Sequence, residues 1–312
     1  MDHAAVERFE AGRGRLASLA YRLLGSAADA EDAVQDAFLR WQAADRDSIE
    51  VPEAWLTKVV TRLCLDRLRS AQARHERAAG DWLPEPLLEG DPMLGPAGTF
   101  EQRESVSLAV LTLMERLSPA ERAAYVLREA FCYPHAEIAG ILDITESASQ
   151  QYVHRARRRV ADERRAGDGA DPATARRIVE EFLAAATSGR TERLVELLTA
   201  DVTVLSDGAG LARRLLRFTT RERVASYVRA GFKPTAAKRR LAGGSVAFHI
   251  AVINGSPAVL AVVGERVAGV VAFELSDGRV AFLRGIAAPD RLARLDGAWR
   301  RRGPDAPFIS GW

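Results

Sequence analysis

The sequence is poor in cysteine and has no long apolar run, and each shortage excludes a class of protein. Cys64 and Cys132 are its only cysteines, and no CxxC or Cys/His cluster has the spacing of metal ligands. Two isolated thiols favour a reduced, cytoplasmic chain over a disulfide-stabilised secreted one. The N-terminus lacks the apolar core of a signal peptide, and no run approaches the roughly 18 apolar residues that span a bilayer. We therefore expect a cytoplasmic protein with no metal, no cofactor and no membrane contact.

Net charge is also nearly absent, at +2 for 312 residues, but the charges are unevenly distributed. Residues 155–165 hold six arginines, whereas residues 81–104 hold six acidic residues and one arginine. Charge blocks of this kind indicate binding partners better than the total does. The length fits two or three domains of about 100–200 residues each, so function can be divided along the chain.

Residues 1–77 predict a compact all-α domain of three helices. Apolar residues recur at helical spacing up to Leu24, Gly25 can end that helix, and Ser26 or Asp29 can begin the next. A third helix begins near Pro52 and turns a row of basic residues outward. Of the two tryptophans at positions 41 and 55, we assign the first to the core and leave the role of the second open.

Residues 78–100 form an acidic connector whose density of proline and glycine excludes a helix or strand interior. It contains the apolar motif WLPEP, residues 82–86, followed by two leucines. Two prolines favour a preordered extended segment, which lowers the cost of ordering it on docking. Our first hypothesis is that this segment lies against the C-terminal domain in the free chain.

Residues 101–166 predict a second helical domain, with helical periodicity resuming at Glu101. Ser118 and Glu121 have the spacing of a capping box. A short helix, a turn at residues 143–145 and a helix opening near Glu146 have the form of a helix-turn-helix. The second helix turns amides, His154 and arginines outward, which suits base edges and phosphates of DNA.

Residues 172–298 predict an α+β domain, a cone or half-barrel, and residues 299–312 a basic tail. Helical segments come first, and four β-type runs at roughly ten-residue spacing follow, which predicts a curved antiparallel meander in a four- or five-stranded sheet. The polar candidates Asp201, Asp207, His249 and Glu274 form no spaced acid/base pair, so we assign no catalytic residue.

Several motifs resemble one family. The segments DAEDAVQDAFLRWQ and AWLTKVVTRLCLDRLRS resemble regions 2.1 to 2.4 of extracytoplasmic-function (ECF) RNA polymerase sigma factors, and LSPAERAAYVLREAF with SASQQYVHRARRRV resembles their region 4. WLPEP and IAAPDRLARL are similar to signatures of the subgroup that carries a C-terminal SnoaL-like (NTF2-like) domain. The resemblance implies a multidomain chain with two all-α sigma domains, a region 2 bundle and a region 4 helix-turn-helix, followed by an α+β NTF2-like cone.

The resemblance also implies site residues. Those that bind polymerase are Asp32, Gln35, Asp36, Leu39 and Arg40. Those that bind the minus-ten DNA are Trp55, Lys58, Arg62, Asp66 and Arg67. Those that bind the minus-thirty-five DNA are Ser147, Gln150, Gln151, His154, Arg155 and Arg158. The cis-regulatory linker residues are Trp82, Leu83, Pro84, Glu85 and Pro86.

The implied partners are core RNA polymerase, through its β′ clamp helices and β flap, and promoter DNA. The implied function is promoter-specific initiation, regulated in cis by contacts of the C-terminal domain with the linker and region 2. We expect a monomer when free, and no enzyme activity. A second hypothesis for the linker is that it enters the basic channel near the polymerase active centre. The alternative function is a DNA-binding regulator fused to a small-molecule-binding or polyketide-cyclase-like enzyme domain.

Three positions depart from the family pattern. Gln150, Gln151 and Tyr152 stand where many relatives carry Lys-Ser-Arg, so the promoter sequence cannot be transferred. Ala288 replaces the usual Asn before Pro289, and residues 206–210 only approximate an Asp-Gly-Gly-Gly motif.

Overall fold

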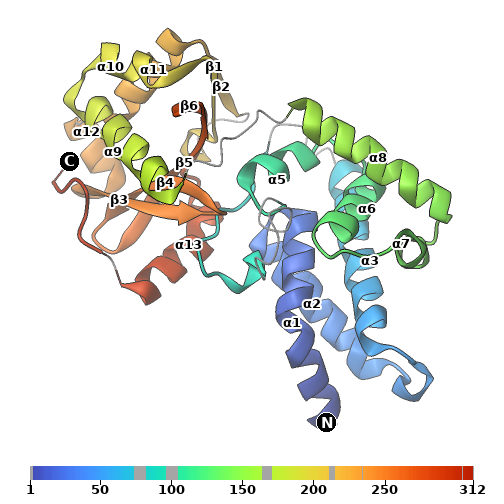
Figure 1. Ribbon diagram of the computed structural model, residues 1–312. Coiled ribbons are helices and arrows are strands. Elements are labelled where there is room, and N and C mark those ends of the chain that lie inside the picture. The colour runs from blue at the N-terminus through green and yellow to red at the C-terminus, as the bar shows by residue number, and fades with distance from the viewer. Residues whose placement is uncertain are drawn as a thin grey trace. The chain divides into compact units, whose positions relative to one another are not determined.

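The computed structural model describes residues 3–73, 82–95, 105–163, 171–210, 215–233, 235–303 and 305–311 (Figure 1). These residues separate into two compact units. The first contains the residues up to Glu85 together with Gly90–Glu163, and the second contains Pro86–Glu89 together with the described residues beyond 163. The predictions for residues 74–81, 96–104 and 164–170 lie outside the described residues.

The first unit begins with a bundle of three helices, α1 (His3–Leu24), α2 (Ala27–Ala43) and α3 (Pro52–Ala73), with a short 3-10 turn η1 (Arg46–Ser48) between the last two. Gly25 ends α1 at a φ of 64°, and the Ser26 side chain accepts a hydrogen bond from the Asp29 backbone N–H at 3.1 Å. Ser26 therefore begins α2. Trp41 is only 1% exposed and donates its indole N–H to the Ala5 carbonyl, which confirms its place in the core.

The rest of the first unit is η2 (Pro92–Leu94), α5 (Leu108–Met114), α6 (Pro119–Glu129), α7 (His135–Leu142) and α8 (Glu146–Glu163). Ser118 and Glu121 form the predicted capping box at the start of α6. The predicted start of helical periodicity at Glu101 lies outside the described residues. Helix α5 begins at Leu108, where the Ser107 side chain caps it by accepting from the Val110 N–H at 3.2 Å.

Two buried arginines tie these elements together. Arg122 of α6 donates to the Leu23 carbonyl at the end of α1 at 2.9 Å and pairs with Glu115 at 2.8 Å. Arg22 of α1 donates to Ser105 at 3.0 Å and to the Leu94 carbonyl at 2.9 Å. Burial lowers the pKa of Arg22 to about 10. The helices before and after the connector thus form one body.

The second unit is built on a sheet of six strands in the order β2-β1-β6-β5-β4-β3. The last four strands, β3 (Val246–Ile253), β4 (Ser256–Val263), β5 (Arg266–Ser276) and β6 (Arg279–Ile286), pair antiparallel in sequence, which confirms the predicted meander. The predicted number of four or five strands was wrong. β1 (Leu198–Ser206) pairs parallel with β6, and β2 (Leu216–Thr219) has only four residues, three of them exposed.

Helices cover both faces of this sheet (Figure 1). Because neighbouring side chains of a strand point to opposite faces, Phe248 and His249 of β3 lie on different faces of the sheet. Phe248 belongs to the apolar core formed with α9 (Pro172–Ser188), α10 (Thr191–Glu196) and α11 (Arg221–Phe232). His249 lies against Trp299 of α13 (Pro289–Arg302) on the other face, with ring centroids 5.0 Å apart. Helix α13 includes residues 299–302, the first residues of the predicted tail.

Two short elements complete the second unit, η3 (Gly208–Gly210) after β1 and α12 (Ala236–Ala242) after α11. The Asp207 carboxylate accepts hydrogen bonds from the Ala287 and Ala288 N–H groups at 2.9–3.0 Å. It thus satisfies backbone donors at the start of α13, where Ala288 has no capping side chain of its own.

Candidate nucleic-acid and protein-binding surfaces

The outer face of α2 is polar apart from one residue. Its predicted polymerase-binding residues Asp32, Gln35, Leu39 and Arg40 are exposed, and Asp36 is half-buried. Leu39 is 56% exposed, although leucine is one of the residues most often buried. The opposite face, with Trp41, is fixed in the bundle core. Helix α2 therefore presents a rigid surface with an apolar residue among charges.

Arg67 of α3 lies against this acidic surface. One guanidinium nitrogen is 2.7 Å from an Asp36 carboxylate oxygen, and another is 3.8 Å from an Asp32 oxygen. The side chain also donates to the Asp29 carbonyl at 3.2 Å. The structure thus brings together Arg67, predicted for DNA, and Asp36, predicted for polymerase.

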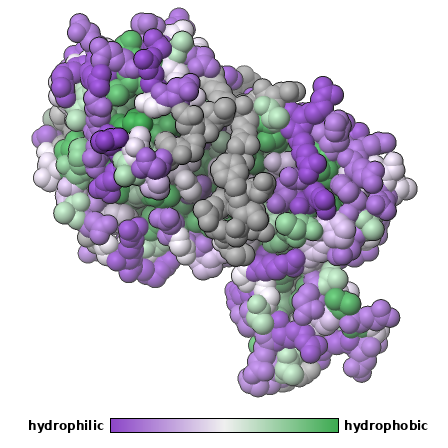
Figure 2. Space-filling view, in the orientation of Figure 1, coloured by the Kyte–Doolittle hydropathy of each residue, from purple (hydrophilic) through white to green (hydrophobic). Residues whose placement is uncertain are grey.

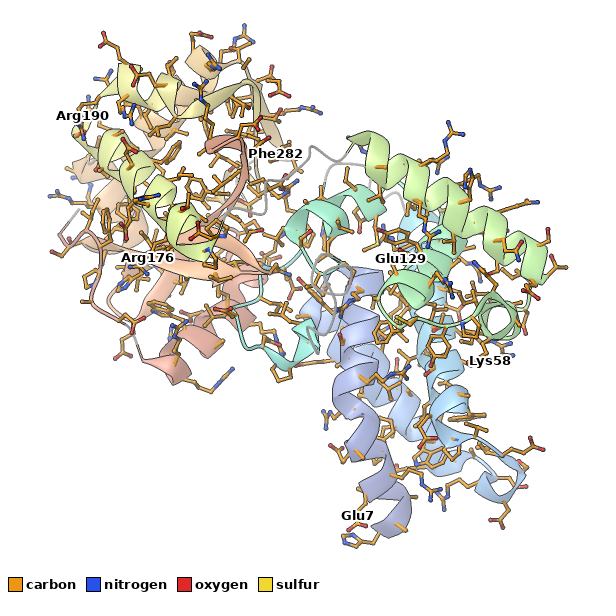
Figure 3. The ribbon with its side chains drawn as sticks, viewed as in Figure 1. Glu7, Lys58, Glu129, Arg176, Arg190 and Phe282 are labelled. Carbon is orange, nitrogen blue, oxygen red and sulfur yellow. The ribbon has the colours of Figure 1, made fainter. Side chains whose placement is uncertain are left out.

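Two other predicted DNA-binding cations of α3 are held by the turn of the helix-turn-helix. Lys58 Nζ lies 3.1 Å from an Asp143 carboxylate oxygen and 2.6 Å from the Gly140 carbonyl, and Arg62 pairs with the other Asp143 oxygen. Figure 3 shows Lys58 beside α7. Hydrogen bonds from Lys58 and Arg62 lower the pKa of Asp143. Both cations therefore have an anionic partner within the unit.

The remaining α3 candidates differ in exposure. Trp55, left open by the sequence, is half-buried with its ring centroid 5.7 Å from that of Trp41. It therefore packs on the bundle core and keeps only part of its surface for a ligand. Asp66 is exposed and lies 3.7 Å from Arg69, one turn along the same helix.

Helix α8 carries the predicted minus-thirty-five residues on its outer side. Those with exposed side chains are Ser147, Gln150, Gln151, His154, Arg155 and Arg158. Val153, Ala156 and Val160 face inward and hold the helix in the unit. The exposed row therefore has a fixed orientation, as a recognition helix requires.

Arg155 and Arg159, one turn apart on α8, both bind the buried carboxylate of Glu121. Glu121 accepts from Arg155 Nε at 2.8 Å and lies 3.0 Å from Arg159, while its oxygen also accepts from the Ser118 N–H. Burial raises the pKa of Glu121, but the bonds from Arg155 and Ser118 outweigh it and the net shift is downward. Glu121 thus both caps α6 and orients arginines of α8.

The described linker segment, residues 82–89, is divided between the two units, and its first half, residues 82–85, belongs to the first unit. Gly25 has no room for a side chain, since a Cβ there would lie 2.6 Å from the Trp82 ring. Glu85 donates its N–H to the Gly25 carbonyl at 2.9 Å, and its carbonyl accepts from the Tyr21 hydroxyl at 2.7 Å. Trp82 and Glu85 are thereby fixed at the junction of α1 and α2.

The Glu85 carboxylate also lies at the start of α2. It accepts from the Ser26 hydroxyl at 2.7 Å and from the backbone N–H groups of Ala27 and Ala28. Burial raises the pKa of Glu85 despite these bonds. A linker carboxylate therefore satisfies free donors of the very helix that carries the candidate polymerase surface.

The second half of the segment, residues 86–89, belongs to the second unit and extends its sheet. Leu88 forms an antiparallel bridge with Ile253, and the Glu89 N–H donates to the Val252 carbonyl at 3.0 Å. Asn254, fully buried, accepts from the Leu87 N–H at 2.7 Å through its side chain and donates its own N–H to the Leu87 carbonyl. The linker thus docks on the edge strand β3.

The same strand edge carries a second segment. The Phe248 N–H donates to the Ile309 carbonyl at 2.8 Å, and the Phe308 N–H donates to the Phe248 carbonyl at 2.8 Å. The outer edge of β3 is therefore paired with two segments. Phe248 is bonded to residues 308–309, and Val252 is bonded to the linker.

The polar candidates of the second unit are engaged separately. Asp207 binds backbone donors near α13, Glu274 pairs with Arg284, and His249 packs on Trp299. Among the described residues, no three of His, Cys, Asp and Glu are grouped to hold a metal ion. Likewise, no helix in the described ranges is both long and apolar enough to cross a membrane.

Sequence reasoning missed several residues that organise these surfaces. Asp143 was assigned only to a turn, Glu121 only to a cap, and Asn254 only to the border of a strand. Each makes its decisive contact with a residue more than 30 positions away, which local patterns do not reveal. The one available signal was the Asn254-Gly255 pair, typical of a tight hairpin turn.

Comparison with known proteins gives consistent results. The chain matches the protein families Sigma-70 region 2 over residues 7–74 and Sigma-70, region 4 over residues 107–160. It is 36% identical to the ECF RNA polymerase sigma factor SigJ of Mycobacterium tuberculosis, over 92% of this chain and 93% of the relative. It is 32% identical to the probable ECF sigma factor SigI of the same species, over 92% and 94%. The crystal structure of M. tuberculosis SigJ superposes with a TM-score of 0.68 at 35% identity, covering 93% of this chain and 98% of that one.

Proposed function

Because this chain belongs to the family of ECF RNA polymerase sigma factors, which bring core RNA polymerase to promoters and start transcription, we propose which of its surfaces make the contacts. The outer face of α2 binds polymerase at its β′ clamp helices, α3 binds the minus-ten DNA, and α8 binds the minus-thirty-five DNA. Because polymerase and promoter DNA are in the cytoplasm, the chain acts there. The family is not one of enzymes, and the separate engagement of Asp207, His249 and Glu274 supports the absence of turnover.

The observation that carries the polymerase assignment is the exposure of Leu39 among charged residues on a rigid helix. A leucine that is more than half exposed contributes less to the stability of the bundle than a buried one, and it can become a buried anchor in an interface whose rim is polar. The surrounding charges, Asp32, Gln35 and Arg40, supply that rim.

Leu39→Asp is expected to weaken binding of core RNA polymerase by at least tenfold while leaving the thermal unfolding of the chain unchanged. The measurement is the affinity of purified core polymerase for the tagged chain. Val51→Asp is the matched control, because Val51 is also 56% exposed but lies outside α2. Equal loss of binding in both variants, or in neither, would refute the assignment of this surface.

The described structure is a closed state of the DNA-binding modules. Lys58 and Arg62, proposed to contact DNA, share the single carboxylate of Asp143 in the turn before α8. DNA phosphates and the Asp143 carboxylate compete for the same two cations. The minus-ten contact therefore requires that the helix-turn-helix leave α3, and binding of core polymerase supplies the free energy to separate them.

Asp143→Asn should shift the free chain toward the open state and raise its affinity for promoter-length DNA. Asn tolerates the left-handed conformation of residue 143, whose φ is 54°, so the turn itself is kept. Asp277→Asn is the matched control, because Asp277 is an exposed Asp with a φ of 51° in the other unit. Fluorescence anisotropy of labelled DNA measures both. If the two variants gain affinity equally, the gain reflects net charge alone and the closed state has no inhibitory role.

The C-terminal domain regulates initiation in cis through the linker. Support comes from the connector itself, whose residues 82–85 are fixed on α1 and α2 and whose residues 86–89 are paired with β3. The start of α2 receives the Glu85 carboxylate, so release of the linker alters the helix that carries the polymerase surface. Through this connection the domain biases the choice between closed and open states.

A further inference from the structure

The segment from residue 213 to residue 240 is the most basic part of the chain. It contains ten lysines and arginines and one acidic residue, Glu222, a net charge of +9. The whole chain carries +2, so all other residues together carry −7. The described part of this segment is β2, α11 and α12, in the second unit and away from both sigma modules in sequence.

The cations of this segment point outward. Arg217 on β2, Arg223 and Arg229 on α11, and Arg239 and Arg240 on α12 are all exposed. Lys233 is exposed between the two helices, and Lys238 links them by donating to the Gly231 carbonyl at 2.8 Å. Figure 2 shows mostly hydrophilic residues over the end of this unit where α10 and α11 lie. We call Arg217, Arg223, Arg229, Lys233, Arg239 and Arg240 the basic surface.

Several arginines elsewhere in the same unit form ion pairs. Arg176 of α9 pairs with Glu180 at 2.8 Å, and Arg193 of α10 pairs with Glu196 at 2.6 Å. Within the described ranges, Arg223, Arg239 and Arg240 form no ion pair. The exposed charged residues between positions 215 and 240 are cationic apart from Glu222.

Helix stability explains only some of the positions at which these cations lie. Arg229, Arg239 and Arg240 lie in last turns of helices, where cations complement the macrodipole. Arg221 and Arg223 lie in the first turn of α11, where the macrodipole disfavours cations. Arg217 is on a strand. Local helix stability therefore does not explain Arg221 and Arg223.

We propose that the basic surface of the C-terminal domain binds the phosphate backbone of duplex DNA without reading its sequence. Guanidinium groups match phosphate geometry, and backbone contacts of this kind need only exposed cations that follow one face. The inference rests on the proposed binding of DNA by α8. Only residues 164–170 separate the end of α8 from the second unit, so DNA held by α8 is presented to this domain at high effective concentration. The domain is then a third DNA contact of the sigma factor.

The test is the salt dependence of binding of the full-length chain to a long duplex of random sequence. Each phosphate contact adds about −0.9 to the slope of log K against log salt concentration. The triple variant Arg223→Gln, Arg239→Gln and Arg240→Gln should make the slope shallower by about 2 to 3. The control Arg279→Gln, Arg301→Gln and Arg302→Gln removes the same charge from exposed positions outside the basic surface and should leave the slope close to wild type.

The failures of this inference and of the α8 assignment are distinguishable. Arg158→Gln on α8 probes the proposed function, and its effect on the slope is measured separately and in combination with the triple variant. An unchanged slope in the triple variant overturns the inference whatever Arg158→Gln does. Failure of the wild-type chain to bind the duplex at low salt overturns it too. Loss of core polymerase binding with an unchanged slope would instead assign the basic surface to an acidic protein partner and refute the DNA contact.

Discussion

Arg122→Met is expected to lower the free energy of unfolding of the first unit by about 3–5 kcal/mol, because it leaves a buried carboxylate without its partner. The side chains of Arg122 and Glu115 are 4% and 6% exposed, so water cannot replace the lost 2.8 Å contact. The change also frees the Leu23 carbonyl at the end of α1. Thermal unfolding should shift down by roughly 6–20 °C.

A double variant separates the buried charge from the other contacts of Arg122. Arg122→Met with Glu115→Gln removes both charges and should recover most of the lost stability, since an apolar or neutral replacement of a buried pair costs little. Denaturant titration of the wild type, both single variants and the double variant completes the cycle. No recovery in the double variant would show that the lost stability comes from the Arg122 bonds to the Leu23 and Met114 carbonyls, and not from the ion pair.

Leu87→Ala should release the second half of the linker from β3. Leu87 is fully buried, and truncation of such a leucine costs about 2–5 kcal/mol, which is a factor between about 30 and a few thousand in the docking equilibrium. Hydrogen exchange measures it directly, because the N–H groups of Glu89 and Asn254 are both bonded across this contact. Both should exchange faster by a factor in that range.

Two observations in the same experiment test the division of the linker between the units. The Glu85 N–H is bonded to Gly25 in the first unit and should keep its protection in Leu87→Ala. Leu216→Ala, at an exposed leucine of β2, should change neither group. Simultaneous loss of protection at Glu85 and Glu89 would show that the linker docks as one piece, and would contradict independent attachment.

Local patterns predicted the parts of the fold that depend on local physics. The capping box at Ser118 and Glu121, the core position of Trp41 and the antiparallel order of β3 to β6 all follow from spacing and turn residues, and the structure confirms them. The predicted sheet had too few strands, because β2 is short and exposed and because β1 pairs in parallel with a strand about 80 residues later. A four-residue strand is too short for its alternation to be distinctive, and parallel pairing over this sequence separation leaves no local pattern.

For the candidate surfaces, too, the sequence predicted only some of the properties. Helical periodicity identified which side chains of α2 and α8 are exposed, since exposure follows from the inward residues of the same helix. The partners of the charged residues were not predictable, because an exposed Lys58 and a Lys58 paired with Asp143 give the same sequence pattern. The basic surface was overlooked for another reason. Its charges are spread over β2, α11 and α12, and only the total of the segment shows the excess.

The pairing of two short segments with β3 has a consequence for solubility. β3 is the last strand of the sheet, and an unpaired outer strand is a template for association with other chains. The linker covers it at Val252 and Asn254, and the chain's final residues cover it at Phe248. Withdrawal of the linker would leave this strand unpaired at Val252, so Leu87→Ala chains should aggregate more readily than wild-type ones.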